Sequence, residues 1–326
     1  MVILYILLLI VGFAALIKGA DWFVDGSSNV ARLLKVPGVI VGLTIVAMGT
    51  SAPELAVSTS AALAGSNEIA LSNVVGSNMF NLLCVLGVCA IIQKVPVDEN
   101  ILKRDFPICI LITIMTTAVI GFPTFRGRLW NSASVSDTVG EASRPLGIAL
   151  LVIFAVYIVF LVFSAMKHPV TEKDDEKLFS VGRSILLILV GVALIVGGGQ
   201  AVVNSAKEIA RIAGMSETLI GLTIVAVGTS LPELVTSVVA AGKGETGMAV
   251  GNVVGSNLFN LLLILGVSST IHPIGVNLAS VYDLLILSIV TVVTYLFSAV
   301  GRSVKRAEGF VLVMIYVGAV IFAALR

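Results

Sequence analysis

The chain has 326 residues, of which 58% are hydrophobic and only 12% charged, and its mean hydropathy is +1.10. A soluble domain carries about a quarter charged residues, so this composition excludes an ordinary soluble protein. The formal net charge of +1 creates no strong field for nucleic acid, and we expect no nucleic-acid partner.

Apolar stretches separated by polar breaks run through the whole chain, and each is long enough to cross the ~30 Å hydrocarbon core of a bilayer as a helix. The alternating pattern typical of an outer-membrane barrel is absent. The first stretch lacks a basic leader and a clear cleavage site, so we interpret it as a span and not a signal peptide. The ten predicted spans cover residues 2–31, 37–64, 68–92, 104–122, 145–166, 180–211, 217–241, 246–270, 280–300 and 306–325.

The distribution of Lys and Arg predicts the direction of these spans. With the N-terminus outside, the inside loops hold 13 of the 20 basic residues and the outside holds six. The charged linker 167–179 then lies in the cytoplasm and separates a first half, 1–166, from a second half, 180–326. We therefore expect a multi-pass protein of the cell (plasma) membrane with an outside N-terminus.

Two sequence blocks recur in the two halves at one offset. GLTIVAMGTSAPELAVS (42–58) matches GLTIVAVGTSLPELVTS (221–237) at 13 of 17 positions, 179 residues apart. ALSNVVGSNMFNLLCVLGV (70–88) matches AVGNVVGSNLFNLLLILGV (249–267) at 14 of 19 positions with the same offset. Each half has five spans, an odd number, so the second half starts on the opposite side of the membrane. The sequence therefore predicts an all-α membrane protein of ten transmembrane helices in two inverted-topology repeats of five.

Glu54 and Glu233 lie inside the second and seventh predicted spans, where an ionised carboxylate costs about 2.5–3.5 kcal/mol even on a lenient scale. No Lys or Arg lies in either motif, so we expect a cation to compensate the charge. Pro53 and Pro232 precede the two acids and predict helix kinks that free backbone carbonyls. Transporters built from inverted repeats bind substrate near the midplane, often at such broken helices.

Hydroxyl and amide side chains accompany each acid. Thr50 and Ser51 are expected on the face of Glu54, and Asn73, Ser77 and Asn81 form a polar stripe on the third span. The second half repeats this set as Thr229, Ser230, Asn252, Ser256 and Asn260. Oxygen ligands of this kind suit Ca²⁺ and Na⁺.

Other polar and small residues admit a structural role. Asn73, Asn78, Asn252 and Asn257 either bind ions or hold helices together, and the pattern leaves both open. Asp21 and Asp25 correspond to Gln200 and Asn204 in the second half, which favours a role at the mouth or interface over one in the central site. The pattern GNVVG (251–255) predicts close helix packing, and Cys84, Cys89 and Cys109 are expected to be core residues.

The motifs GTSAPE (49–54), GTSLPE (228–233), GSNMFN (76–81) and GSNLFN (255–260) resemble those of the cation/calcium antiporter superfamily, most closely short prokaryotic sodium/calcium exchangers. The resemblance implies that Glu54 and Glu233 bind both ions, and that Thr50 and Thr229 offer main-chain carbonyls to calcium. It implies sodium ligands at the carbonyls of Ala47 and Ala226 and the hydroxyls of Ser51, Ser77, Ser230 and Ser256. It places Asn81 and Asn260 at the centre, and the Asn at 260, where potassium-dependent relatives carry Asp, argues against potassium transport. The first and sixth helices would slide as a pair across a fixed core.

The sequence therefore favours a secondary-active antiporter that exchanges Na⁺ for Ca²⁺ by alternating access. Two glutamates neutralise one Ca²⁺, and an empty site keeps its charge in a low dielectric, which would resist crossing. A proton/calcium antiporter, a cation channel and a membrane scaffold remain as alternatives. We expect no enzymatic activity and no cofactor; the expected partners are the transported Ca²⁺ and Na⁺ and the lipid bilayer. The oligomeric state stays open, a monomer being sufficient for transport.

Overall fold

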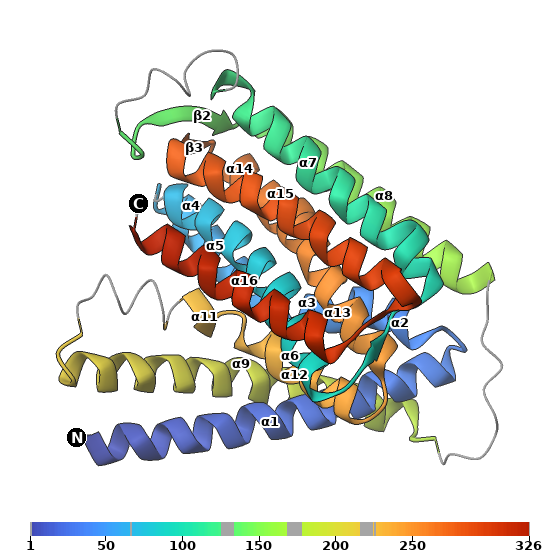
Figure 1. The fold of residues 1–326 in the computed structure, drawn as a ribbon. Helices are drawn as coiled ribbons and strands as arrows, with labels where there is room; N and C mark the ends of the chain where they lie inside the picture. The colour runs from blue at the N-terminus through green and yellow to red at the C-terminus, as the bar shows by residue number, and fades with distance from the viewer. Residues whose placement is uncertain are drawn as a thin grey trace. The chain divides into compact units, whose positions relative to one another are not determined.

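The computed structural model describes residues 2–65, 67–124, 134–167, 178–215, 224 and 226–325, and these residues are mostly helical (Figure 1). They form two compact units, each of which draws on both halves of the sequence. Unit 1 comprises Met1–Pro53 and Leu161–Gly255, and unit 2 comprises Glu54–Phe160 and Ser256–Arg326.

Unit 1 is built around two long helices. They are α1 (Val2–Leu33) and α9 (Val181–Ile212), which lie side by side in Figure 1. The Ser180 hydroxyl caps α9 by accepting a hydrogen bond from the Arg183 amide. The other elements of unit 1 are α2 (Gly38–Val41), the π-helical turn η1 (Gly42–Val46), α3 (Ala47–Thr50), α11 (Ala226–Gly228), α12 (Leu231–Gly242) and most of α13 (Thr246–Leu258).

Glycines allow the backbones of α1 and α9 to touch. A Cβ added at Gly19 would lie 2.8 Å from the carbonyl oxygen of Gly191, and one at Gly198 would lie 2.7 Å from that of Gly12. The predicted GNVVG packing is confirmed in the same unit, because a Cβ at Gly251 would lie 2.5 Å from the carbonyl oxygen of Val39. Small residues at these positions let membrane helices approach closely.

Unit 2 contains the remaining helices and two short sheets. Its helical elements are α4 (Ala52–Leu63, whose first two residues belong to unit 1), α5 (Asn67–Met79), η2 (Phe80–Val85), α6 (Leu86–Ile92), η3 (Ile101–Asp105), α7 (Phe106–Pro123), most of α8 (Arg144–Lys167), η6 (Phe259–Ile264), α14 (Leu265–Ile271), α15 (Leu278–Ala299), η7 (Val300–Arg302) and α16 (Arg306–Leu325). Its strands are β1 (Val95–Pro96), β2 (Thr138–Ala142), β3 (Ile274–Asn277) and β4 (Ser303–Val304).

The packing in unit 2 follows the same physical rules. Strand β1 pairs antiparallel with β4, and β2 pairs antiparallel with β3. Helix α16 contacts α6 through Gly309 and Gly87: a Cβ at Gly309 would lie 2.6 Å from the carbonyl oxygen of Gly87. The Asn277 side chain caps α15 by accepting from the Ser280 amide at 2.9 Å.

The described helices agree closely with the predicted spans. Eight of them are long and apolar enough to cross a membrane, and a ninth span results if the bent pair Gly38–Thr50 and Ala52–Leu63 is counted as one. The seventh predicted span, 217–241, lies partly outside the described residues, and the longest described helix at this place, Leu231–Gly242, has 12 residues. A helical membrane protein is thus evident, while the count of ten and the two repeats of five stay predictions. The cysteines are free, with Cys89 and Cys109 buried and Cys84 half-buried.

Candidate functional site

Two helix breaks, one in each sequence repeat, position the acids. Helix α3 ends at Thr50 and α4 begins at Ala52, and Ser51 between them has φ −83° and ψ 7°. Ser230 precedes α12 with nearly the same backbone angles, φ −96° and ψ 6°. The first predicted kink is confirmed as a bend of 49° between Gly38–Thr50 and Ala52–Leu63. In the second repeat a turn at 229–230 separates α11 from α12.

Each break places its glutamate in the first turn of a new helix. Glu54 lies in the first turn of α4, and Glu233 in the first turn of α12. The unpaired amides and the helix dipole at this end favour negative charge, which lowers the cost of burying a carboxylate. Both acids have no exposed surface.

In unit 1, side chains from both sequence repeats converge on Glu233. The Ser51 hydroxyl, from the first repeat, donates a hydrogen bond to Glu233 Oε1 at 2.8 Å. The Thr50 hydroxyl lies 3.1 Å from Asn252 Oδ1, while the Asn252 amide nitrogen contacts the Ser237 hydroxyl at 2.9 Å and the Glu233 main-chain carbonyl at 3.5 Å. We name Glu233, Ser51, Thr50, Asn252 and Ser237 the Glu233 cluster.

The side-chain contacts of Ser51 and Thr50 reach the second sequence repeat. A continuous helix would place both on the face of Glu54, but the break at Ser51 interrupts that helix. Their side-chain partners within the described residues belong to the second repeat, namely Glu233 and Asn252.

In unit 2, Glu54 has a matching set of neighbours. The Asn73 amide nitrogen donates to the Glu54 main-chain carbonyl at 3.2 Å and to the Ser58 hydroxyl at 2.9 Å. The Ser77 hydroxyl lies 3.5 Å from Glu54 Oε1. We name Glu54, Ser58, Asn73 and Ser77 the Glu54 cluster.

The same asparagine clamp therefore occurs in both repeats. Asn73 with Ser58 corresponds to Asn252 with Ser237 at the sequence offset of 179. Each asparagine fixes the peptide of a glutamate, so the two residues hold helices, one of the two roles that the sequence left open. Sequence reasoning missed Ser58 and Ser237, although they form the last identical pair of the first matched block and were detectable there.

Asn81 and Asn260 lie at equivalent places in the π-helical turns η2 and η6. Such turns occur frequently at functional sites, because they widen the helix and redirect a side chain. Asn260 donates to Asn78 Oδ1 at 2.9 Å, and Asn78 donates to the Asn257 carbonyl at 3.3 Å. Asn78 thus links two segments of unit 2.

Several buried oxygens of the predicted site residues lack a hydrogen-bond partner within the described part of the chain. They are Glu233 Oε2, Asn81 Oδ1 and Asn260 Oδ1. A buried polar atom without a partner costs free energy, which a coordinated cation would offset. Each of these residues offers a hard oxygen donor in dry surroundings, the type of ligand that hard metal ions prefer.

The remaining predicted site residues are also placed. Thr50, Ala47, Ser230 and Ser256 have no exposed surface, Ser77 is nearly fully buried, and Thr229 is half-buried. Ala226 begins α11. Asp21 and Asp25 belong to neither cluster and instead contact Lys243.

Several known proteins that this chain resembles in sequence or fold are described as exchangers or antiporters. The family described as sodium/calcium exchanger protein matches residues 4–163 and 183–325. The chain is 37% identical to the putative antiporter CaxA of Alkalimonas amylolytica, with 95% of each chain covered, and 33% identical to the sodium/calcium exchanger MaX1 of Methanosarcina acetivorans, with 97% of each covered. A solved structure of the sodium-calcium exchanger NCX_Mj, soaked with 10 mM Na⁺ and zero Ca²⁺, matches with a TM-score of 0.83 and 32% identity over 100% of both chains. This chain therefore belongs to the sodium/calcium exchanger family, within the cation/calcium antiporter superfamily.

Proposed function

We propose that the protein exchanges Na⁺ for Ca²⁺ across the cell membrane by alternating access. The observation that carries the proposal is the hydrogen bond from Ser51, in the first sequence repeat, to the buried carboxylate of Glu233, in the second. Motifs 182 residues apart thereby meet at one ionisable group, in a setting where a carboxylate needs a cationic partner.

The proposed ion ligands are the oxygens of the two repeat motifs. Glu54 and Glu233 supply the charge, and the main-chain carbonyls of Thr50 and Thr229 contribute to calcium binding. Sodium is held by the carbonyls of Ala47 and Ala226 and by the hydroxyls of Ser51, Ser77, Ser230 and Ser256, with Asn81 and Asn260 at the centre. The unpartnered carboxylate oxygen of Glu233 among the described residues supports this set.

Charge balance supports exchange over a leak. Two carboxylates neutralise one Ca²⁺, and several Na⁺ ions would do the same. An unloaded pair of acids would carry its charge through a low dielectric, which is unfavourable. The protein would therefore cross between states only when loaded, and this coupling distinguishes an antiporter from a channel. We propose the ten-helix, inverted-repeat arrangement and the cytoplasmic central loop on the sequence argument alone.

Reconstituted vesicles test the proposal directly. Vesicles loaded with sodium and diluted into sodium-free medium at clamped pH should take up calcium, and vesicles loaded with choline should not. Uptake that requires a proton gradient in place of sodium would establish the proton/calcium alternative. Uptake with neither counter-ion would establish a channel.

The acids provide the second test. Replacing Glu54 or Glu233 with Gln removes the charge but keeps the shape, so Glu54→Gln and Glu233→Gln should each reduce sodium-driven calcium uptake to background. Glu141→Gln is the matched control, because Glu141 is exposed on β2 and should retain uptake. Size-exclusion profiles in detergent check that all three variants fold. Normal uptake by either buried-acid variant would contradict the proposed ligand set.

A further inference from the structure

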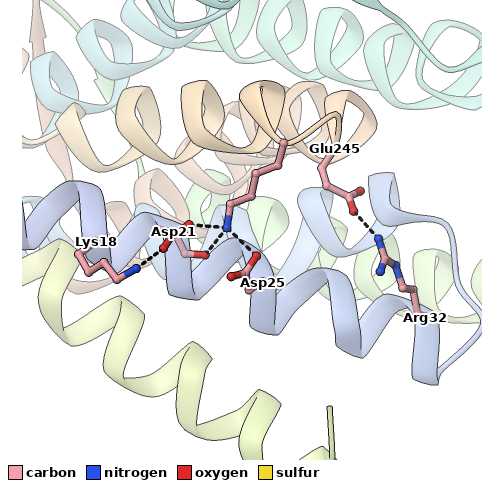
Figure 2. A network of polar contacts seen from close by, with 6 residues as sticks. Lys18, Asp21, Asp25, Arg32 and Glu245 are labelled. Atoms are coloured by element: carbon pink, nitrogen blue, oxygen red, sulfur yellow. Dashed lines mark hydrogen bonds and ion pairs between the residues drawn. The ribbon is translucent and has the colours of Figure 1, made fainter. Parts of the chain in front are cut away.

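A polar network joins helix α1 to the turn between α12 and α13. That turn contains Lys243, Gly244 and Glu245, and Figure 2 shows Glu245 facing Arg32 of α1. Lys243 Nζ lies 2.5 Å from a carboxylate oxygen of Asp21 and 2.5 Å from one of Asp25. Glu245 accepts a hydrogen bond from Arg32 at 3.2 Å.

The order of the charges fixes one alignment of α1 against this turn. The turn carries a cation and then an anion, while α1 presents two anions and, seven residues after Asp25, a cation. Sliding α1 by one helical turn, about 5.4 Å, in either direction would leave Lys243 opposite only one of its two aspartates and would separate Glu245 from Arg32. The contacts therefore specify register as well as proximity.

The network is weak enough to break and re-form. A cavity of about 340 Å³ adjoins it, lined by Asp25, Ser28, Asn29, Arg32, Phe179, Lys243 and Glu245. The charged side chains keep between 26% and 42% of their surface exposed, so water screens each pair. Ion pairs of this kind shift an equilibrium only roughly two- to fivefold each.

Lys243 remains a cation at neutral pH. Partial burial by itself would lower the pKa of its ammonium group, but the hydrogen bonds that it donates to Asp21 and Asp25 outweigh burial and raise the pKa above its usual value. The contacts that keep it charged are the contacts that α1 provides.

The attachment of α1 to α9 is of a different kind. Their backbones touch at Gly19 and Gly191, and the Asn29 amide donates to the Ser184 hydroxyl at 2.7 Å. These dry, close contacts hold α1 and α9 together. The partly solvent-exposed ion pairs at the turn connect α1, and with it α9, to α12, the helix that carries Glu233.

We propose that Lys243 and Glu245 form an ion-pair latch that holds α1, together with α9, in one register against the α12–α13 turn in one transport state and releases it in another. The inference rests on the proposed function, because a latch requires a cycle with two states. The latch residues connect α1 with the turn and are not among the proposed ion ligands.

Reversible cross-linking tests the latch. In a variant whose native cysteines are replaced by alanine, Asp25→Cys with Lys243→Cys is linked by a bis-methanethiosulfonate reagent whose spacer is about as long as a lysine side chain. We expect sodium-driven calcium uptake to fall at least tenfold on linking and to return when dithiothreitol cleaves the link. Asn29→Cys with Ser184→Cys, linked to the same extent, is the control within the α1–α9 pair and should keep uptake within twofold.

A labelling experiment reports on the latch without transport. Ser28 lines the cavity and is 8% exposed, so the modification rate of Ser28→Cys by a water-soluble thiol reagent reports opening. Adding Lys243→Gln should raise that rate two- to fivefold, whereas Lys305→Gln, an exposed lysine of unit 2, should leave it unchanged.

Two results would overturn the latch: full uptake after Asp25–Lys243 linking, or an unchanged labelling rate with Lys243→Gln. Failure of the proposed function has a different signature. The cysteine-free protein would then show no sodium-driven uptake before any linking, and the labelling rate alone would decide whether the latch exists.

Discussion

At the scale of single residues, the breaks at Ser51 and Ser230 explain how a membrane helix tolerates a buried acid. Each break starts a new helix just before a glutamate, so that the acid lies at the helix end where the dipole favours negative charge. Ser51 adds a hydroxyl donor at 2.8 Å from Glu233. The serine therefore has two functions: it ends one helix and it orients the acid of the other repeat.

Replacing Ser51 with alanine tests this orienting role. Ser51→Ala removes a hydrogen bond to a buried carboxylate, and we expect the calcium concentration for half-maximal uptake to rise roughly threefold to tenfold. Initial uptake rates over a calcium titration measure it. Ser72→Ala, at an exposed serine of α5, should leave the titration unchanged. An unaltered titration for Ser51→Ala would show that the hydrogen bond does not position Glu233.

The burial of the two acids and the helix break beside the first proline were predictable from the sequence. The hydrogen-bond partners of the acids were predictable only in part. Because a charge in lipid is costly, Glu54 and Glu233 stand out as exceptional residues of apolar spans from the sequence alone. Helical spacing also predicted that Asn73 and Ser77 face the same way, and both contact Glu54. It did not predict that Thr50 and Ser51 contact Asn252 and Glu233 of the second repeat, because spacing rules relate only residues of one helix.

At the scale of elements, the contact between α1 and α9 depends on the absence of side chains. The carbonyl oxygens of Gly191 and Gly12 occupy the places where β-carbons of Gly19 and Gly198 would lie. The sequence shows these glycines, yet pairing them requires knowing which helices are neighbours.

Adding one methyl group at Gly19 should loosen this contact. The new Cβ of Gly19→Ala would lie 2.8 Å from the Gly191 carbonyl oxygen, so the helices must separate. Overpacking of this kind costs about 1–3 kcal/mol, which should lower the midpoint of thermal unfolding in detergent. Gly182→Ala has no atom within 4 Å of its added Cβ and should leave the midpoint unchanged or slightly higher. Equal midpoints for the two variants would mean that the added methyl group at Gly19 does not lower the free energy of unfolding.

The limits of the helices were well predicted, but their internal irregularities were not. Predicted spans such as 68–92 and 246–270 agree with the described Ile69–Ile92 and Thr246–Ile271. The π-helical turns η2 and η6 inside these spans follow from no simple periodicity. They appear at equivalent positions, so the repeat could have indicated that any irregularity in one copy has a counterpart in the other.

At the scale of the whole molecule, the compact units do not follow the two halves of the sequence. Unit 1 takes Met1–Pro53 from the first half and most of Leu161–Gly255 from the second. Hydropathy and repeats divide the chain into two consecutive halves. Tertiary contacts join helices from both halves, so the compact units do not coincide with these halves. A division at 167–179 therefore describes the repeat and its linker, and the contacts define a separate division.

The proposed membrane orientation has a direct test on helix α9, both of whose ends are described. Excess Lys and Arg place the start of α9 inside and its end outside. In cysteine-free protein, a membrane-impermeant thiol reagent added to intact cells should label Ala213→Cys and leave Ser180→Cys unlabelled until the cells are permeabilised. Both positions are exposed, so burial does not protect either thiol. The opposite labelling pattern would reverse the proposed orientation.

The contacts of Asn73 and Asn252 with the glutamate backbones have a consequence for ion preference. Asn73 and Asn252 grip the peptide carbonyl of each glutamate, so helix geometry at these positions is anchored through main-chain atoms. An acid shortened by one methylene, or replaced by its amide, would meet the same scaffold. If Glu54 and Glu233 bind the ions as proposed, substitutions at these two positions should change ion preference without changing the surrounding helices.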